Sequence, residues 1–278
     1  MNGNALAGRT ALVTGANTGI GRVTAVELAR QGARVFLACR SPERAQAVLE
    51  EIRSHGGKAE LLPLELGDFA SVRQCAQSFL ARSLPLHLLI NNAGLAGARG
   101  RTRDGFELAF GVNHLGHFLL TQLLLDRIRA SAPARIVTVA SKAHYRARGI
   151  DWDAVREPTR NRTGLPEYQT SKLANVLFSA ELGRRLAGTG VNTYSLHPGV
   201  VATEVWRSVP WPLGWLLKFA LIPPEEGAKT TLHCATSPSV GAETGLYYDQ
   251  CRAKWPSRVA QDEALARTLW ERSEEWVR

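Results

Sequence analysis

The sequence has few cysteines, and their spacing fits neither a metal site nor a disulfide framework. Four cysteines occur among 278 residues, and no two of them form a C-x-x-C pair. Because zinc sites and small disulfide-rich domains need closely spaced cysteines, we predict no metal site. We expect reduced thiols and a cytoplasmic protein, with Cys39 and Cys75 buried as small hydrophobic residues.

A signal peptide and a long apolar run are also lacking. Residues 1–8 form a short polar start, and no run of roughly 18 apolar residues follows. The nearest candidate, residues 206–222, is interrupted by charged residues and prolines. The sequence therefore predicts no membrane-spanning helix, while peripheral contact with a membrane surface stays open.

The basic charge of the chain comes without a nucleic-acid-binding motif. The net charge is +9, but no zinc-finger, homeodomain or RNA-binding signature occurs, and the arginines are scattered along predicted helices. We expect no nucleic-acid partner. The basic residues then form a solvated surface, or some of them bind a cofactor phosphate or contact an anionic membrane surface.

Apolar runs alternate with helical patterns from end to end of the chain. The runs are continuous, which predicts strands buried on both faces, and strand–helix alternation predicts a parallel sheet. We predict an α/β fold: a single-domain, Rossmann-like, doubly wound parallel sheet flanked by helices over residues 1–278, with an irregular insertion at 200–223. The expected strands are 10–14, 34–38, 59–64, 87–90, 135–140 and 191–196. We expect one helix after Gly19, a second that starts at Ser41, and three more over 69–82, 105–130 and 167–187.

A glycine string follows the first predicted strand. Glycines at positions 15, 19 and 21 permit a tight turn and close approach of backbone to a pyrophosphate at the start of a helix. An ordinary strand–helix turn is also rich in glycine, but the position after the first strand of an α/β chain favours a dinucleotide. The predicted contacts are Gly15, Asn17, Thr18, Gly19, Ile20 and Gly21.

The end of the second predicted strand carries Arg40, where an NAD-binding chain would carry an acidic residue. A guanidinium there can bond a 2′-phosphate, and we expect no acid at that strand end to oppose it. A plain surface arginine is the alternative. We predict NADP(H) rather than NAD(H) as the cofactor.

Three further features converge on the carboxyl ends of the strands. Residues 91–94 (Asn-Asn-Ala-Gly) end the fourth strand, Ser141 follows the fifth, and Tyr168 and Lys172 share one face of the next helix. A free phenol has a pKa of about 10, which is too high for proton exchange near neutrality. A neighbouring lysine and an oxidised nicotinamide would favour the phenolate, and a serine hydroxyl can stabilise a developing alkoxide. Each residue alone is common on surfaces, but together they predict hydride transfer.

These residues resemble the short-chain dehydrogenase/reductase family from about Arg9 to the carboxyl terminus. The resemblance implies that Asn113 holds a helix kink and a relay water, that Lys172 also bonds the nicotinamide ribose, and that Thr203 bonds the carboxamide. The remaining cofactor contacts that we expect are Glu65, Leu66, Asn92, Ala93, Gly94, Tyr168, Pro198, Gly199 and Val201.

Longer strings are similar to the retinol dehydrogenase-like branch of that family, including its dehydrogenase/reductase member 13-like relatives. They are 38–40 (ACR), 112–118 (VNHLGHF), 171–178 (SKLANVLF) and 197–201 (HPGVV). That branch prefers NADP and acts on retinoids and other lipophilic aldehydes or alcohols. The chain departs from the pattern in three ways: Glu65 replaces an aspartate near the adenine, Ala140 replaces a serine, and we see no amino-terminal membrane anchor.

The expected substrate contacts are aromatic. Residues 200–223 are rich in tryptophan, and this region covers the substrate in the family; packing on the core, an oligomer face and membrane contact are alternatives. His197 is interpreted as a strand-end histidine. The predicted substrate contacts are His144, Tyr145, Trp206, Trp211 and Trp215.

The leading hypothesis is an NADP(H)-dependent oxidoreductase for lipophilic carbonyls and alcohols such as retinal and retinol. One rival is a reductase of the same family with a polar substrate, and another is a non-catalytic dinucleotide-binding sensor. A sensor would not need Asn113, Ser141, Tyr168 or Lys172. Members of the family often pair through the helix that bears Tyr168, so the resemblance also implies a homo-oligomer.

Overall fold

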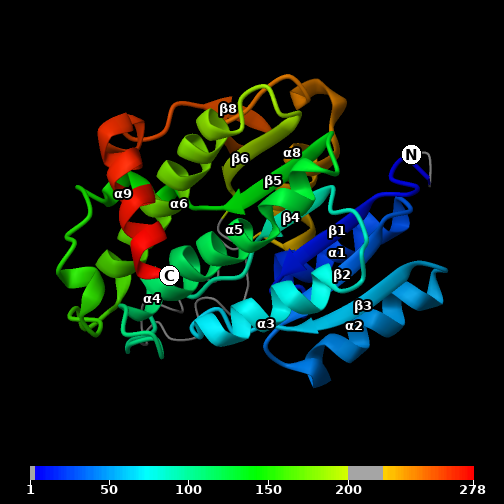
Figure 1. The fold of residues 1–278 in the computed structure, drawn as a ribbon, viewed down its shortest axis with the longest axis horizontal. Helices are drawn as coiled ribbons and strands as arrows, with labels where there is room; N and C mark the ends of the chain where they lie inside the picture. The colour runs from blue at the N-terminus through cyan, green and yellow to red at the C-terminus, as the bar shows by residue number, and fades with distance from the viewer. Residues whose placement is uncertain (1–3, 200–221) are drawn as a thin grey trace.

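A single eight-stranded sheet with the strand order β3-β2-β1-β4-β5-β6-β7-β8 organises the molecule (Figure 1). The computed structural model describes residues 4–199 and 222–278. All neighbouring strands are parallel except β7 and β8. The α/β prediction is therefore confirmed, with one antiparallel edge strand added. The strands are β1 (Thr10–Thr14), β2 (Arg34–Cys39), β3 (Lys58–Pro63), β4 (Leu88–Asn91), β5 (Ala134–Val139), β6 (Val191–His197), β7 (Leu246–Asp249) and β8 (Arg252–Lys254).

Helices cover both faces of the sheet (Figure 1). One apolar core lies under α3, α5, α6 and α9, and a second lies under α1, α2 and α8. The described α-helices are α1 (Gly19–Arg30), α2 (Pro42–Ser54), α3 (Phe69–Leu80), α4 (Leu108–Phe110), α5 (Gly116–Arg129), α6 (Leu165–Arg185), α8 (Pro224–Thr236) and α9 (Glu263–Trp276). Short 3-10 turns, η2 (Lys142–Arg146) and η7 (Val259–Gln261) among them, join some of these elements.

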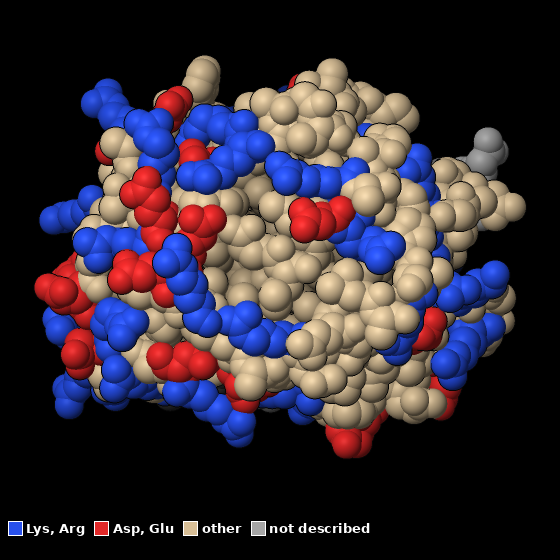
Figure 2. Space-filling model, viewed as in Figure 1, with Lys and Arg blue, Asp and Glu red and all other residues tan. Residues whose placement is uncertain are grey.

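Charged side chains are mixed on the face that Figure 2 presents. Lys and Arg are spread over this face with Asp and Glu among them. On this face the basic side chains are therefore interspersed with acidic ones and do not form one continuous basic stripe.

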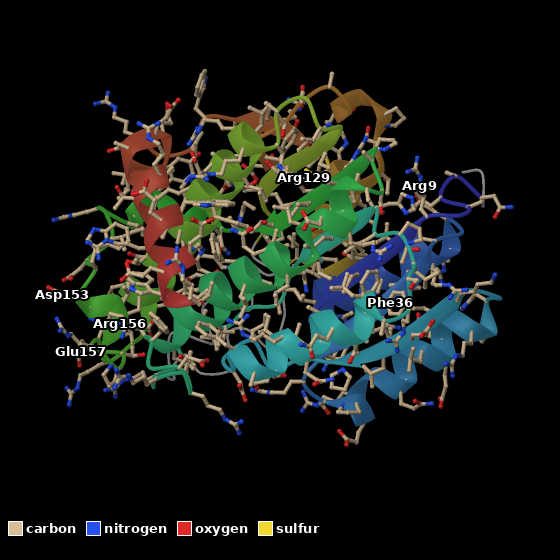
Figure 3. All side chains as sticks on the ribbon, in the orientation of Figure 1. Arg9, Phe36, Arg129, Asp153, Arg156 and Glu157 are labelled. Carbon is tan, nitrogen blue, oxygen red and sulfur yellow. The ribbon has the colours of Figure 1, made fainter. Side chains whose placement is uncertain are left out.

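The strands send alternate residues to the two cores, as continuous apolar strands should. Phe36 of β2 (labelled in Figure 3) faces the α3 side, where its ring meets Phe79 edge-on at a centroid distance of 5.0 Å. Its neighbours Val35 and Leu37 face the α1 side. Cys39 and Cys75 are each 1% exposed, so the prediction that both are buried is confirmed.

The helical stretch predicted over 105–130 is not a regular α-helix throughout. Gly111–Leu115 forms a π-helical segment, η1, between α4 and α5. In the described residues one helical stretch, Leu108–Arg129, is long and apolar enough to cross a membrane, although the sequence predicted none. Since 72% of its most apolar window is buried inside the fold, the stretch also fits a core helix, and it is weak evidence for a span. The other candidate, 206–222, lies outside the described residues except at its end.

Candidate active site

A cleft of about 1190 Å³ opens at the carboxyl ends of the parallel strands. It joins the glycine loop after β1, the end of β2, the segment after β4, the start of η2, α6 and the end of β6. We call this cavity the cleft. Most of the site residues predicted from the sequence line it: Gly15, Asn17, Thr18, Gly19, Ile20, Gly21, Arg40, Glu65, Leu66, Asn92, Ala93, Gly94, Ser141, Tyr168, Lys172, Pro198 and Gly199.

The glycine loop is shaped for a close ligand. Gly15 and Gly19 have φ angles of +65° and +55°, which favour glycine. A Cβ on Gly21 would stand 2.3 Å from the Gly15 carbonyl oxygen and 2.5 Å from the Asn92 amide nitrogen. The first turn of α1 has no acidic residue, and the side chain of its N-cap, Thr18, makes no capping bond. Free amide groups at a helix start suit a pyrophosphate, so these residues fit a dinucleotide.

Thr14, at the end of β1, joins the glycine loop to the segment after β4. Its hydroxyl accepts hydrogen bonds from the backbone amides of Asn92 and Ala93, both at 2.9 Å. The Asn92 side chain donates to the Thr14 carbonyl at 2.9 Å. His117 Nε2 lies 2.8 Å from the same hydroxyl, and burial lowers the pKa of His117 to about 4. The sequence analysis missed this link, because only the fold brings Thr14 and His117 together.

Asn113 lies in the π segment and is fully buried behind the cleft wall. Its carboxamide bonds the backbone of Leu95 twice, accepting from the amide at 2.9 Å and donating to the carbonyl at 3.0 Å. It also donates to the Ser171 hydroxyl at 2.9 Å. The helix irregularity that the resemblance implied is therefore at the expected residue, and Asn113 fixes Leu95 on the cleft wall.

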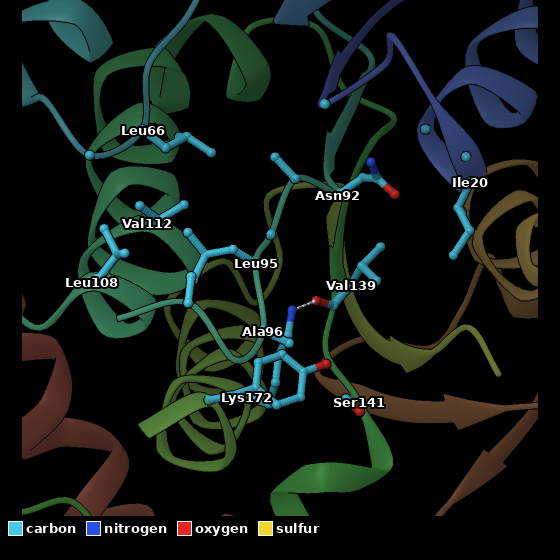
Figure 4. Close-up of a pocket in the computed structure, with 18 of the residues that line it drawn as sticks. Ile20, Leu66, Asn92, Leu95, Ala96, Leu108, Val112, Val139, Ser141 and Lys172 are labelled. Carbon is cyan, nitrogen blue, oxygen red and sulfur yellow. Dashed lines mark hydrogen bonds between the residues drawn. The ribbon is translucent and has the colours of Figure 1, made fainter. Parts of the chain in front are cut away.

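Ser141, Tyr168 and Lys172 meet at one end of the cleft, which we call the catalytic end. The Lys172 ammonium nitrogen donates to the Val139 carbonyl at 2.8 Å (dashed in Figure 4) and stands 5.7 Å from the centroid of the Tyr168 ring. Burial lowers the pKa of Lys172 to about 7. Burial also raises the pKa of Tyr168, and its hydrogen bond with Ser141 opposes this in part. The predicted partners lie together. The largest effect on the pKa of the Tyr168 phenol, however, is that of burial, which raises it, and not that of Lys172.

The opposite end of the cleft contains an ion pair that the sequence did not predict. Arg40 lies 3.4 Å from the Glu65 carboxylate, whose other oxygen accepts from the Gly67 amide at 3.1 Å. The expectation that no acid stands beside Arg40 is wrong. The second strand carries none, but Glu65 follows β3, which pairs with β2 in parallel register.

Two of the predicted substrate contacts do not line the cleft. His144 is fully buried, with Nδ1 2.7 Å from the Ser141 carbonyl oxygen and its ring 4.1 Å from that of Tyr145. The Tyr145 hydroxyl donates to the Trp255 carbonyl at 2.6 Å. His144 is thus tied to the backbone of the catalytic end, which corrects its predicted role. Five further predicted contacts lie outside the described residues: Val201, Thr203, Trp206, Trp211 and Trp215.

Sequence comparison agrees with this geometry. The model of the family described as short chain dehydrogenase matches residues 9–152. The chain therefore belongs to the short-chain dehydrogenase/reductase family, whose members are oxidoreductases of alcohol and carbonyl groups.

The particular relatives lie in the retinol dehydrogenase branch. Retinol dehydrogenase 11 of Homo sapiens is 47% identical over 272 residues, which cover 96% of this chain and 85% of the relative. Dehydrogenase/reductase SDR family member 13 of Bos taurus is 46% identical over 279 residues, which cover 96% of this chain and 73% of the relative. Among solved structures, a protein assigned as an NAD(P) dependent gluconate 5-dehydrogenase from Beutenbergia cavernae, with NADP bound at low occupancy, has a TM-score of 0.72 and 27% identity over 90% of this chain and 97% of that one.

Proposed function

We propose that this protein is an NADP(H)-dependent oxidoreductase that interconverts a lipophilic carbonyl compound and its alcohol, such as retinal and retinol. The observation that carries the proposal is the meeting of Tyr168, Ser141 and Lys172 at the end of a cleft whose other parts fit a dinucleotide. The names of the relatives support the retinoid class of substrate.

The nicotinamide cofactor, when bound, supplies or accepts the hydride. The residues of the chain handle the proton. Tyr168 is placed to exchange its phenolic proton with the substrate oxygen, and Ser141 to hold that oxygen by a hydrogen bond. Because Lys172 lies beside the Tyr168 ring, its positive charge favours the phenolate when the amine is protonated.

The choice of NADP(H) rests on Arg40. Its side chain is 75% exposed at the end of β2 and lines the cleft, so it can turn toward a 2′-phosphate. Glu65 beside it would hold the guanidinium in place before the cofactor binds, and would compete with the phosphate afterwards. The NADP in the Beutenbergia cavernae structure supports the same choice.

The apolar part of the cleft supports a lipophilic substrate. Leu66, Leu95, Leu108 and Val112 lie on one side of it (Figure 4). A wall of this kind binds apolar groups by excluding water. The predicted tryptophan contacts in 200–223 belong to the same proposal and lie outside the described residues.

The test is a panel of aldehydes and ketones, including retinal and polar sugars, incubated with NADPH. We expect turnover of the lipophilic members, and we expect Tyr168→Phe to reduce kcat at least about 1000-fold because the proton donor is gone, with NADPH affinity kept. Chromatography of the product and fluorescence titration of NADPH measure the two quantities. Full activity of the Tyr168→Phe variant would refute the mechanism, and preference for polar substrates would refute the substrate class.

A further inference from the structure

The peptide group between Ser141 and Lys142 is held at both of its polar ends by histidine side chains. Its carbonyl oxygen, on Ser141, lies 2.7 Å from Nδ1 of His144. Its amide, on Lys142, donates to Nδ1 of His197 at 3.3 Å. His144 comes from η2 and His197 from the end of β6, so two separate elements fix one peptide plane next to the catalytic end.

The backbone partners determine the protonation of both rings. A carbonyl oxygen only accepts, so Nδ1 of His144 carries the proton, and its Nε2 accepts from the Ser257 amide at 3.2 Å. Nδ1 of His197 accepts from an amide, so its proton is on Nε2. A charged imidazolium donates from both nitrogens and can accept from neither. Both bonding patterns therefore require neutral histidines.

The surroundings keep both histidines neutral. Burial lowers the pKa of His144. Burial, followed by the charge of Lys142, lowers the pKa of His197 to about 4, although Asp249 opposes this. His144 and Lys254 also face His197 and act in the same direction as Lys142. The described groups around His197 thus favour its acceptor form over the whole neutral range of pH.

A second contact restrains the same segment. The Lys142 ammonium lies 3.1 Å from the buried Asp249 carboxylate, which also binds Lys254 at 2.7 Å. Asp249 pairs in register with His197 across β6 and β7. Lys142 is therefore held through its backbone and its side chain by two neighbouring strand ends, which leaves Ser141 little freedom to rotate.

We propose that His144 and His197 are positioning residues for the reaction, which act by clamping the Ser141–Lys142 peptide and so aiming the Ser141 hydroxyl at Tyr168. The inference rests on the proposed function. Ser141 is the residue whose hydrogen bond counters the effect of burial on Tyr168. If the peptide turned, that bond would weaken, and the phenol would give up its proton at a higher pH.

The main test compares His197→Leu with His197→Asn. Asparagine keeps an acceptor at the position of Nδ1, and leucine does not. With NADP⁺ and retinol, the direction in which Tyr168 acts as the base, we expect His197→Leu to lower kcat about 3- to 10-fold and to move the rising limb of the pH profile to higher pH. The Kd for NADPH should be unchanged. His197→Asn should restore kcat and the pH profile. Unshifted pH profiles, or equal losses in the two variants, would overturn the proposal.

The matched control is His87→Leu. His87 Nδ1 also accepts from a backbone amide, that of Thr10 at 3.0 Å, but at the amino ends of β1 and β4, whereas the cleft lies at the carboxyl ends of the strands. Its loss should lower thermal stability and leave kcat and the pH profile unchanged. If it shifted the pH profile as His197→Leu does, the effect would be general loosening and the clamp would be refuted.

Two further measurements isolate the route through Ser141. In a Ser141→Ala background, His197→Leu should cause no further loss of kcat, and a full additional loss would refute the route. His144→Asn, which keeps a donor toward Ser141, should retain more kcat than His144→Leu, and equal losses would contradict the role of His144.

A cofactor-free measurement separates this inference from the proposed function. Tyrosinate absorbance is measured as a function of pH in the wild type and in Tyr168→Phe. The difference between the two curves gives the ionisation of the Tyr168 phenol without any substrate. The pKa of Tyr168 should rise in His197→Leu and stay in place in His197→Asn and His87→Leu. An unmoved pKa would overturn the clamp, whether or not the protein reduces any carbonyl tested.

Discussion

At the scale of single residues, the proposed preference for NADP(H) depends on Arg40 and its ion-pair partner Glu65. The sequence placed Arg40 at the end of the second strand, where the structure has it, because that end can be located from the apolar run. It could not predict the pairing, because Glu65 reaches Arg40 only through the register of β2 and β3. The guanidinium is thus not alone at that end of the cleft.

Two substitutions separate the roles of this pair. Arg40→Leu should weaken NADPH binding about 10- to 100-fold, since a hydrogen bond to a charged group contributes roughly 1.5–3 kcal/mol. Glu65→Gln keeps an acceptor for the Gly67 amide and removes the competing charge, so it should tighten NADPH binding by up to about 5-fold, the range of an exposed ion pair. Fluorescence titration with NADPH and NADH measures both. An unchanged NADPH/NADH ratio in Arg40→Leu would refute the assignment.

Lys172 should reduce stability in a pH-dependent way. Its pKa falls from 10.5 in the unfolded chain to about 7 in the fold. Below pH 7 both states carry the charge, and the native state bears the full penalty of burying it. Between pH 7 and 10.5 the unfolded chain keeps a proton that the native state has lost, so stability rises with pH.

Lys172→Met removes this penalty. We expect the variant to have a higher Tm than wild type below pH 7, with a gain that shrinks as the pH rises toward 10.5. Calorimetry at several pH values measures the difference, and the variant should lose activity at all of them. A gain that is independent of pH, or no gain, would contradict the burial of a titrating amine.

At the scale of elements, the sequence predicted most helices and strands where the structure places them. For the helical stretch over 105–130, only the family resemblance implied an irregularity at Asn113, and the residue pattern itself did not. The π segment at Gly111–Leu115 has no local signal, since its residues are compatible with an ordinary helix. The bonds of Asn113 to Leu95 and Ser171 accompany the wider turn there, and they link residues far apart in the sequence.

The carboxyl-terminal helix α9 was also missed, and it carries a large part of the packing. Trp270 is 4% exposed; its ring stacks on Phe178 of α6 at 6.0 Å, meets Phe118 edge-on at 5.1 Å, and lies under Arg185. The outer face of α6 is thus covered within the chain. The pairing through this helix that the resemblance implied stays a prediction.

Trp270→Ala should therefore destabilise the protein by about 3–5 kcal/mol, the cost of emptying a packed aromatic site. Trp255→Ala is the control, because Trp255 is 83% exposed and should change stability by less than about 0.5 kcal/mol. Urea unfolding measures both. Similar losses in the two variants would mean that α9 does not pack as described.

At the scale of the whole molecule, the parallel order of the strands brings the site together. The sequence placed Asn91–Gly94, Ser141 and the Tyr168 helix at strand ends, and the sheet order sets those ends around one cleft. Local residue patterns were enough for this, because parallel strands share one carboxyl edge. They were not enough for His117, His144 and His197, whose roles arise from backbone groups that only the fold makes neighbours.

The most direct test of the central claim follows the hydride itself. NADPH deuterated at both C4 positions is incubated with retinal, and the alcohol is examined by mass spectrometry. Hydride transfer in this cleft predicts one deuterium in the alcohol formed by the wild type and no labelled alcohol from Tyr168→Phe at equal NADPH occupancy. If the wild type binds NADPH yet passes no deuterium to any carbonyl in the panel, the cleft holds a nucleotide without carrying out the reaction.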